Sequence, residues 1–179
     1  TTGCSPRVIE FLRERLSAED LAVYPEYGEA RPELAAFFGV RPEELLLTNG
    51  TDEAIQVVLN TYVDDGEEVV LLKPSYAMYR FYADVAAARV HEVPYRAETL
   101  EFPLEELLAA IGSETRAVLI ANPNNPTGTG VPLEGIEAVL RKAPAAAVLI
   151  DEAYYEFSGV TALPLLGHYP NLFVSRTFS

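Results

Sequence analysis

A short polar segment near residue 50 carries residue types that bind anions. Gly50, Thr51 and Asp52 follow the apolar residues 45–47 and open a helical pattern that continues to Tyr62. Glycine permits a tight turn, and the free N–H groups and dipole at the start of a helix attract negative charge. We expect a phosphate group to bind there. A plain helix cap formed by Thr51 or Asp52 is the alternative.

Aromatic and amide side chains follow later apolar runs. Tyr76 stands at a predicted strand-to-helix junction, where a tyrosine ring can lie flat on an aromatic ligand. A tyrosine of the core is equally consistent with this position. The loop Asn122–Gly128 contains two Asn-Pro steps. Its prolines permit cis peptide bonds and its amides can reach a ligand. A structural Asx-rich loop is the alternative, but we favour binding because the loop follows a strand.

Carboxylates follow the apolar run Ala147–Ile150, which predicts a buried strand ending at Asp151 and Glu152. Burying a carboxylate costs free energy unless the group has a cationic partner. The chain has one cysteine and two histidines. A cysteine-based metal site is therefore excluded, and we predict no metal site.

Apolar runs alternate with helical patterns along the chain. The predicted strands are residues 45–47, 69–72, 89–93, 117–121, 147–150 and 172–175. The first predicted helix begins at Ser5-Pro6. The other predicted helices span residues 31–38, 51–62, 76–86, 104–111 and 132–141. This alternation indicates βαβ units and a mostly parallel sheet covered on both faces. Ligands bind beyond the carboxyl ends of such strands, so we expect the polar segments to lie together.

Charge and hydropathy exclude other classes of function. The net charge is −14 over 179 residues. An acidic surface repels phosphate backbones and anionic lipid, so we expect neither nucleic acid nor membrane partners. The first residues lack the apolar core of a signal peptide, and no apolar run approaches the ~20 residues of a membrane span. We expect a cytoplasmic protein.

Taken in order, these segments resemble the fold-type I pyridoxal-phosphate aminotransferases, and among them the histidinol-phosphate aminotransferases most. The similarity runs from Ser5 to Ser179. The matching motifs are Tyr24-Pro25-Glu26, Gly50-Thr51-Asp52-Glu53, Pro74-Ser75-Tyr76-Ala77-Met78-Tyr79, Pro123-Asn124-Asn125-Pro126-Thr127-Gly128, Asp151-Glu152-Ala153-Tyr154 and Arg176-Thr177-Phe178-Ser179. The resemblance implies an α/β fold. Residues 1–30 would be an N-terminal helix and linker, and residues 31–179 a three-layer α/β/α large domain, incomplete at its C-terminus. The family's second, small domain is not in this chain.

The resemblance also implies pyridoxal 5'-phosphate as the cofactor. Gly50, Thr51 and Asp52 would hold its phosphate, in keeping with the anion site expected from the residues themselves. Thr177 and Ser179 would add contacts to the same phosphate.

The remaining roles implied by the resemblance concern the cofactor ring. Tyr76 would stack on the pyridine ring, and Asn125 and Tyr154 would hydrogen-bond its phenolic oxygen. Asp151 would pair with the protonated pyridine nitrogen, which keeps the ring an electron sink and gives the buried carboxylate its cation. Tyr24 would reach the phosphate bound by a neighbouring subunit, which implies a homodimer.

The reaction implied is reversible transfer of an amino group from glutamate to imidazole-acetol phosphate in histidine biosynthesis. The substrate would be a small molecule, an amino acid or a phosphate ester. The alternatives within the class are a threonine-phosphate decarboxylase, which shares most of these motifs, or another class I/II aminotransferase.

A lysine that binds the cofactor as a Schiff base follows the Ser179 position in this family. The sequence ends at Ser179, and neither Lys73 nor Lys142 stands at a matching position. One hypothesis is an aminotransferase whose remaining residues follow Ser179. The other is a non-catalytic fragment that binds cofactor weakly or serves in assembly. We favour the enzyme, because every type of cofactor contact is present.

Overall fold

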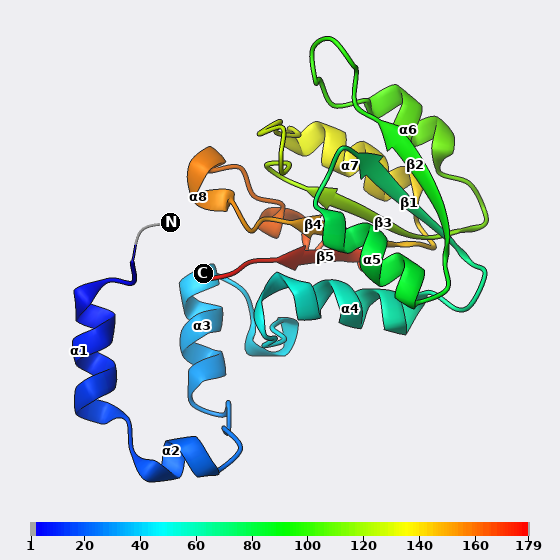
Figure 1. Ribbon diagram of the computed structural model, residues 1–179. Coiled ribbons are helices and arrows are strands. Elements are labelled where there is room, and N and C mark those ends of the chain that lie inside the picture. The colour runs from blue at the N-terminus through cyan, green and yellow to red at the C-terminus, as the bar shows by residue number, and fades with distance from the viewer. Residues whose placement is uncertain (1–2, 179) are drawn as a thin grey trace. The chain divides into compact units, whose positions relative to one another are not determined.

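The chain, described by a computed structural model over residues 3–178, divides into two compact units (Figure 1). The first unit ends at Leu47 and the second begins at Thr48. The first unit contains α1 (Pro6–Arg15), α2 (Ala18–Ala22), α3 (Ala30–Phe38) and the 3-10 helix η1 (Pro42–Glu44). The sequence placed a domain boundary after residue 30, inside this unit. As a division into domains, that boundary stays a prediction.

Local signals explain most of the first unit. Pro6 occupies the first turn of α1 as predicted, where its missing N–H leaves no bond unmade. The sequence did not predict α2, which begins with a capping box between Ser17 and Asp20. The predicted strand at residues 45–47 is wrong, since these residues are not a strand. Leu46 is 63% exposed, and the run has no neighbouring strand in the described sheet with which to form a ladder.

The second unit is built on a sheet of five parallel strands. They are β1 (Glu68–Lys73), β2 (Arg89–Pro94), β3 (Thr115–Ala121), β4 (Ala147–Asp151) and β5 (Leu172–Ser175). Their order is β2-β1-β3-β4-β5, and every neighbouring pair is parallel. The predicted parallel sheet is confirmed.

Helices cover both faces of this sheet (Figure 1). On one face, α4 (Gly50–Tyr62) and α5 (Ala77–Val85) pack on the odd-numbered positions of β1, such as Val69 and Leu71. On the other face, α6 (Leu104–Ala110) and α7 (Leu133–Lys142) pack on the even-numbered positions, such as Val70 and Leu72. Successive strand residues point to opposite faces, so continuous apolar strands supply both cores. The predicted three-layer α/β/α arrangement is confirmed.

The strand order reverses direction between β1 and β3. From β1 the chain passes through α5 to β2 on one side, and from β3 it passes through α7 to β4 on the other. Ligands of open parallel sheets bind at such a reversal, beyond the carboxyl ends of the strands. The short helices α8 (Tyr155–Ser158) and η2 (Leu163–Leu165), which the sequence did not predict, follow β4 at this edge. Among the described residues, no helix is both long and apolar enough to cross a membrane.

Candidate active site

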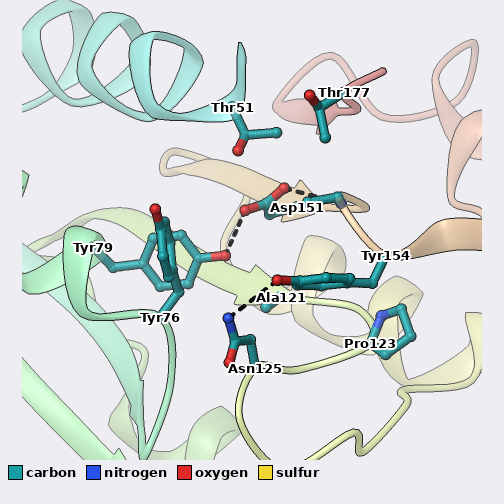
Figure 2. Close-up of a pocket in the computed structure, with 10 residues that line it drawn as sticks. Thr51, Tyr76, Tyr79, Ala121, Pro123, Asn125, Asp151, Tyr154 and Thr177 are labelled. Atoms are coloured by element: carbon teal, nitrogen blue, oxygen red, sulfur yellow. Dashed lines mark hydrogen bonds between the residues drawn. The ribbon is translucent and has the colours of Figure 1, made fainter. Parts of the chain in front are cut away.

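A cavity of about 170 Å³ lies at the carboxyl ends of β3 and β4 (Figure 2). Its walls come from α4, α5 and the segments that follow β3, β4 and β5. The lining residues are Thr51, Tyr76, Tyr79, Ala121, Pro123, Asn125, Asp151, Ala153, Tyr154 and Thr177. The polar segments that the sequence placed after separate strands therefore converge on one cavity. The roles of these residues toward a ligand stay predictions.

Asp151 points into this cavity and is 4% exposed (Figure 2). The Tyr79 hydroxyl donates to its Oδ2 at 2.8 Å, and the Ser175 hydroxyl donates to its Oδ1 at 2.9 Å. The Ala153 N–H adds a bond to Oδ1 at 3.2 Å. Burial raises the pKa of Asp151, and these hydrogen bonds offset the rise only in part. Within residues 3–178, Asp151 forms no ion pair.

The sheet register places these groups. Asp151 is the last residue of β4 and pairs with Ser175 at the end of β5. Its side chain lies on the face covered by α4 and α5, since residues of a strand alternate between faces and Leu149 packs there. Tyr79 of α5, 1% exposed, lies on the same face and reaches Asp151 from within the core. Burial and the neighbouring Asp151 charge raise the Tyr79 pKa well above its usual value, so its hydroxyl stays a donor.

The start of α4 carries the residues that the sequence assigns to an anion site, and that assignment stays a prediction. Gly50 has a φ of +71°, a conformation that favours glycine. Asn49 is the residue before the helix, and its side chain makes no capping bond. Thr51 and Asp52 lie inside the first turn, so the alternative in which one of them caps the helix is wrong. Thr51 lines the cavity, whereas the Asp52 carboxylate accepts a hydrogen bond from the Tyr76 hydroxyl at 3.0 Å.

Tyr76 is partly exposed and faces the cavity, unlike a core tyrosine. Its ring packs edge-on against Tyr79, with centroids 5.7 Å apart. Burial raises the pKa of Tyr76, and its bond to Asp52 raises it further. Tyr79, three residues later, is the member of this pair that belongs to the core.

The asparagines of the loop after β3 have two different roles: two of them hold the loop in place and one lines the cavity. Asn122 is buried and exchanges hydrogen bonds with the backbone of Val131. Asn124 is also buried, accepts from the Ser75 hydroxyl at 2.7 Å and donates to the Pro74 carbonyl at 3.0 Å. Both tie the loop to the fold, so the structural alternative holds for them. The peptide bonds before Pro123 and Pro126 are cis.

Asn125 is the asparagine of this loop that lines the cavity. Its Nδ2 lies 3.4 Å from the Tyr154 hydroxyl, a long hydrogen bond that leaves both groups near the open space (Figure 2). Tyr154 is exposed and precedes α8, in the segment that follows Asp151. Thr51 and Thr177 lie on one side of Asp151, and Asn125 and Tyr154 on the other (Figure 2).

The remaining cofactor contacts named from the sequence stay predictions. Ser179 lies outside the described residues, and Tyr24 belongs to the first unit. Lys73 pairs with Glu92 at the end of β1, and Lys142 ends α7, so neither lysine lines the cavity. Within the described part of the chain, no group of three or more His, Cys, Asp or Glu could hold a metal.

Sequence reasoning missed Tyr79 and Ser175 as partners of Asp151. Tyr79 stands three residues after Tyr76 on a predicted helix, a spacing that places both side chains on one helical face. For Ser175, the register between the last two strands was needed, and that register appears only in the folded sheet.

The family model of aminotransferase class I and II matches residues 1–179. The chain belongs to this family. The resemblance noted from the motifs is confirmed, and the chain spans about half the length of the curated relatives it matches.

A histidinol-phosphate aminotransferase from Bacillus cytotoxicus is 40% identical over 184 residues, which cover 99% of this chain and 49% of that relative. A crystal structure of histidinol-phosphate aminotransferase from Sinorhizobium meliloti, in complex with pyridoxal-5'-phosphate, has a TM-score of 0.88 at 28% identity. The match covers 99% of this chain and 49% of that one. L-threonine-O-3-phosphate decarboxylase from Porphyromonas gingivalis has a TM-score of 0.81 at 24% identity, over 99% of this chain and 55% of that one. That likeness shows the fold alone.

Proposed function

We propose that this chain is the cofactor-binding part of a pyridoxal-phosphate-dependent aminotransferase acting on histidinol phosphate. One observation carries the proposal: Asp151 is a buried carboxylate that faces a cavity and forms no ion pair within the described residues. Such a group is stabilised by a ligand that brings a positive charge. The protonated nitrogen of pyridoxal phosphate is a cation of suitable size.

The other lining residues fit the rest of that cofactor. In pyridoxal phosphate, the phosphate arm is attached on one side of the ring nitrogen and the phenolic oxygen on the other. Around the cavity, Asp151 stands between Thr51 and Thr177 on one side and Asn125 and Tyr154 on the other (Figure 2). The hydroxyls and the start of α4 suit a phosphate, and the amide and phenol suit an oxygen acceptor.

Each residue then has a defined task. Asp151 holds the proton on the ring nitrogen, while Tyr79 and Ser175 fix its two oxygens. When bound, pyridoxal phosphate withdraws electrons from the α carbon of the substrate and carries the amino group between substrates. Tyr76 supplies a flat surface beside the ring, and its bond to Asp52 sets the angle of that surface.

In this proposal, Gly50 and Asp52 contact the phosphate through their backbone and not through their side chains. Gly50 has no side chain and contributes its backbone to the phosphate site at the start of α4. The Asp52 carboxylate is engaged by Tyr76, so we assign its contact with the phosphate to its backbone N–H. Ser179 keeps its proposed contact with the same phosphate.

The substrate assignment rests on the relatives. The relative at 40% identity and the structure that contains pyridoxal-5'-phosphate are both histidinol-phosphate aminotransferases. The proposed reaction is histidinol phosphate plus 2-oxoglutarate giving imidazole-acetol phosphate plus glutamate, or its reverse. A homodimer in which Tyr24 reaches the partner's cofactor, and a cytoplasmic location, are part of the same proposal.

The test combines intact mass, an absorption spectrum and two assays. The protein from its native source is mixed with pyridoxal phosphate, then with histidinol phosphate and 2-oxoglutarate, and glutamate is measured. We expect a yellow complex and glutamate formation. Release of CO₂ from threonine phosphate, without glutamate formation, would instead support a decarboxylase. A mass of 19.6 kDa with no coloured complex would support the non-catalytic fragment.

A further inference from the structure

A second buried carboxylate lies beside Asp151 and takes no part in the cavity. Glu152 is 1% exposed. It accepts the Ala162 N–H at 2.6 Å and the Thr161 hydroxyl at 2.9 Å. Arg176 donates its Nε to the same carboxylate at 2.9 Å, and its Nη2 lies 2.9 Å from it. The Glu152 side chain therefore binds both the loop at residues 161–162 and the residue that follows β5.

Arg176 is held from further directions. Its Nη2 donates to the Thr161 hydroxyl at 2.8 Å, and its guanidinium carbon lies 3.6 Å from the centre of the Tyr155 ring. A planar guanidinium between a carboxylate and an aromatic ring is fixed in angle as well as in position. The cluster of Glu152, Arg176, Thr161 and Tyr155 is thus an oriented clamp on the residue that follows β5.

Successive side chains at the end of β5 point alternately toward the cavity and toward the clamp. The Ser175 side chain binds Asp151 on the cavity side, that of Arg176 binds Glu152 on the opposite side, and Thr177 lines the cavity again. The register of the last two strands runs to the pair Asp151 and Ser175, and the Glu152 N–H donates to the Ser175 carbonyl. Arg176 comes directly after this pair, so the contacts of its side chain bear on the orientation of Thr177.

The ion pair of this clamp should add little to the free energy of unfolding. A buried ion pair gains little net stability, because desolvation of both charges opposes their attraction. Burial raises the pKa of Glu152 even with Arg176 beside it, so the cost of desolvation outweighs the hydrogen bonds and the attraction of the guanidinium. Such pairs are better suited to fixing one geometry.

We propose that Glu152 and Arg176 are positioning residues that orient the segment after β5, so that Thr177 faces the cavity. They act through Thr177 and touch no ligand themselves. The consequence for cofactor binding rests on the proposed function, whereas the orientation of the segment does not.

The test uses Glu152→Gln and Arg176→Lys. The first keeps the shape of the side chain and removes its charge, and the second keeps the charge and removes the planar fork. Hydrogen exchange of peptides containing Thr177 and Phe178 reports how firmly the backbone of the segment is held, and calorimetric titration with pyridoxal 5'-phosphate reports binding. We expect faster exchange in this segment and about tenfold weaker binding, since small displacements of positioning groups have effects of this order or larger. The thermal unfolding midpoint should also fall, because Glu152→Gln leaves the Arg176 charge without its counterion. The readout of positioning is therefore the change in exchange within this segment together with the weaker binding.

Glu67→Gln and Arg116→Lys are controls with the same substitutions in a more exposed pair, because Arg116 Nε donates to Glu67 at 2.8 Å at the opposite end of the sheet. They should leave exchange of the segment and binding as in the unaltered protein. If Glu152→Gln fails to fold, Tyr155→Leu removes the ring beneath the guanidinium from a partly exposed site. Tyr155→Leu should also speed the exchange.

The outcomes separate the two proposals. A lower unfolding midpoint with unchanged exchange in the segment would overturn the positioning role. Faster exchange in the Glu152 and Arg176 variants, but not in the controls, supports it. If the unaltered protein binds no pyridoxal phosphate, the proposed function fails, and the exchange data alone still decide the positioning role.

Discussion

Asp151 and Glu152 are adjacent in the chain and both buried, yet they have different partners. Glu152 faces Arg176 and has a permanent counterion. Asp151 faces the cavity and is held by two hydroxyls and one backbone N–H. The carboxylate with a counterion has its charge satisfied by the protein. The other keeps room for a positive charge from outside.

The difference separates two uses of a buried acid. A pair within the protein fixes the chain, because breaking it leaves an uncompensated charge. A carboxylate held only by neutral donors is oriented but not neutralised, and therefore suits a cationic ligand. Mutations at the two residues should accordingly affect different properties.

The largest effect is expected at Asp151. In the proposed aminotransferase, Asp151→Ala should remove nearly all transamination, a loss on the order of a hundredfold to a thousandfold, as for other preorganised electrostatic groups in active sites. The measurement is kcat/KM for glutamate formation from histidinol phosphate and 2-oxoglutarate. Near-normal turnover in this variant would show that Asp151 has been misassigned.

A smaller loss is expected at Tyr79. Tyr79→Phe removes one hydrogen bond to the Asp151 carboxylate and should lower kcat/KM by about tenfold to a hundredfold, since a hydrogen bond to a charged group contributes on the order of 1.5–3 kcal/mol. Tyr82→Phe, on the same helix but outside the lining of the cavity, is the control. Equal activity of the two variants would mean that Tyr79 does not support Asp151.

The pH dependence of the free energy of unfolding should respond to cofactor at Asp151 but not at Glu152. Burial raises the pKa of Asp151 above its usual value of 3.8 and raises that of Glu152 above 4.5. Each wild-type acid therefore contributes stability that is fully present below its usual pKa. That contribution is lost as the pH rises through the raised pKa of the folded state.

The comparison uses Asp151→Asn and Glu152→Gln, with the free energy of unfolding measured against pH. Without cofactor, the wild type should lose stability relative to each variant as the pH rises, by up to about 1.4 kcal/mol for each unit of pKa shift. Saturating pyridoxal phosphate should flatten this slope for Asp151 alone, because a bound cation lowers its pKa. An equal flattening for Glu152 would remove the distinction between the two acids.

The smallest effect is expected at Tyr95, a second buried tyrosine. Its hydroxyl has no hydrogen-bond partner within the described residues. Tyr95→Phe should change stability by about 1 kcal/mol or less, and in the stabilising direction, because no bond is lost and a buried polar group is removed. Urea unfolding of Tyr95→Phe and Tyr79→Phe compares the two hydroxyls. A clear loss of stability in Tyr95→Phe would point to a buried water bound to that hydroxyl.

Much of the fold and several parts of the site could be predicted from the sequence. Val69–Leu72 and Ala147–Ile150 read as buried parallel strands because their apolar side chains are continuous, and the structure confirms both. The same reasoning failed for residues 45–47, where an apolar run has no strand beside it. Local hydrophobicity does not reveal whether a hydrogen-bonding neighbour is present.

The asparagine loop shows the same limit within the site. The sequence identified residues 122–128 as a segment that could reach a ligand, but it could not divide the asparagines among their tasks. Asn122 and Asn124 bind the backbone of distant segments, and Asn125 is left at the cavity. The division depends on contacts across as many as 50 residues of chain.

By itself, the sequence determined that a carboxylate pair ends a buried strand, and the alternation of a strand requires the two to point to opposite faces. Only the tertiary structure decided which of them meets a cation. The pairing of β5 beside β4 brings Ser175 to Asp151 and Arg176 to Glu152. The physical reason is that a charge is satisfied by whatever the fold places within a few ångströms of it, and that neighbour comes from a strand more than 20 residues away.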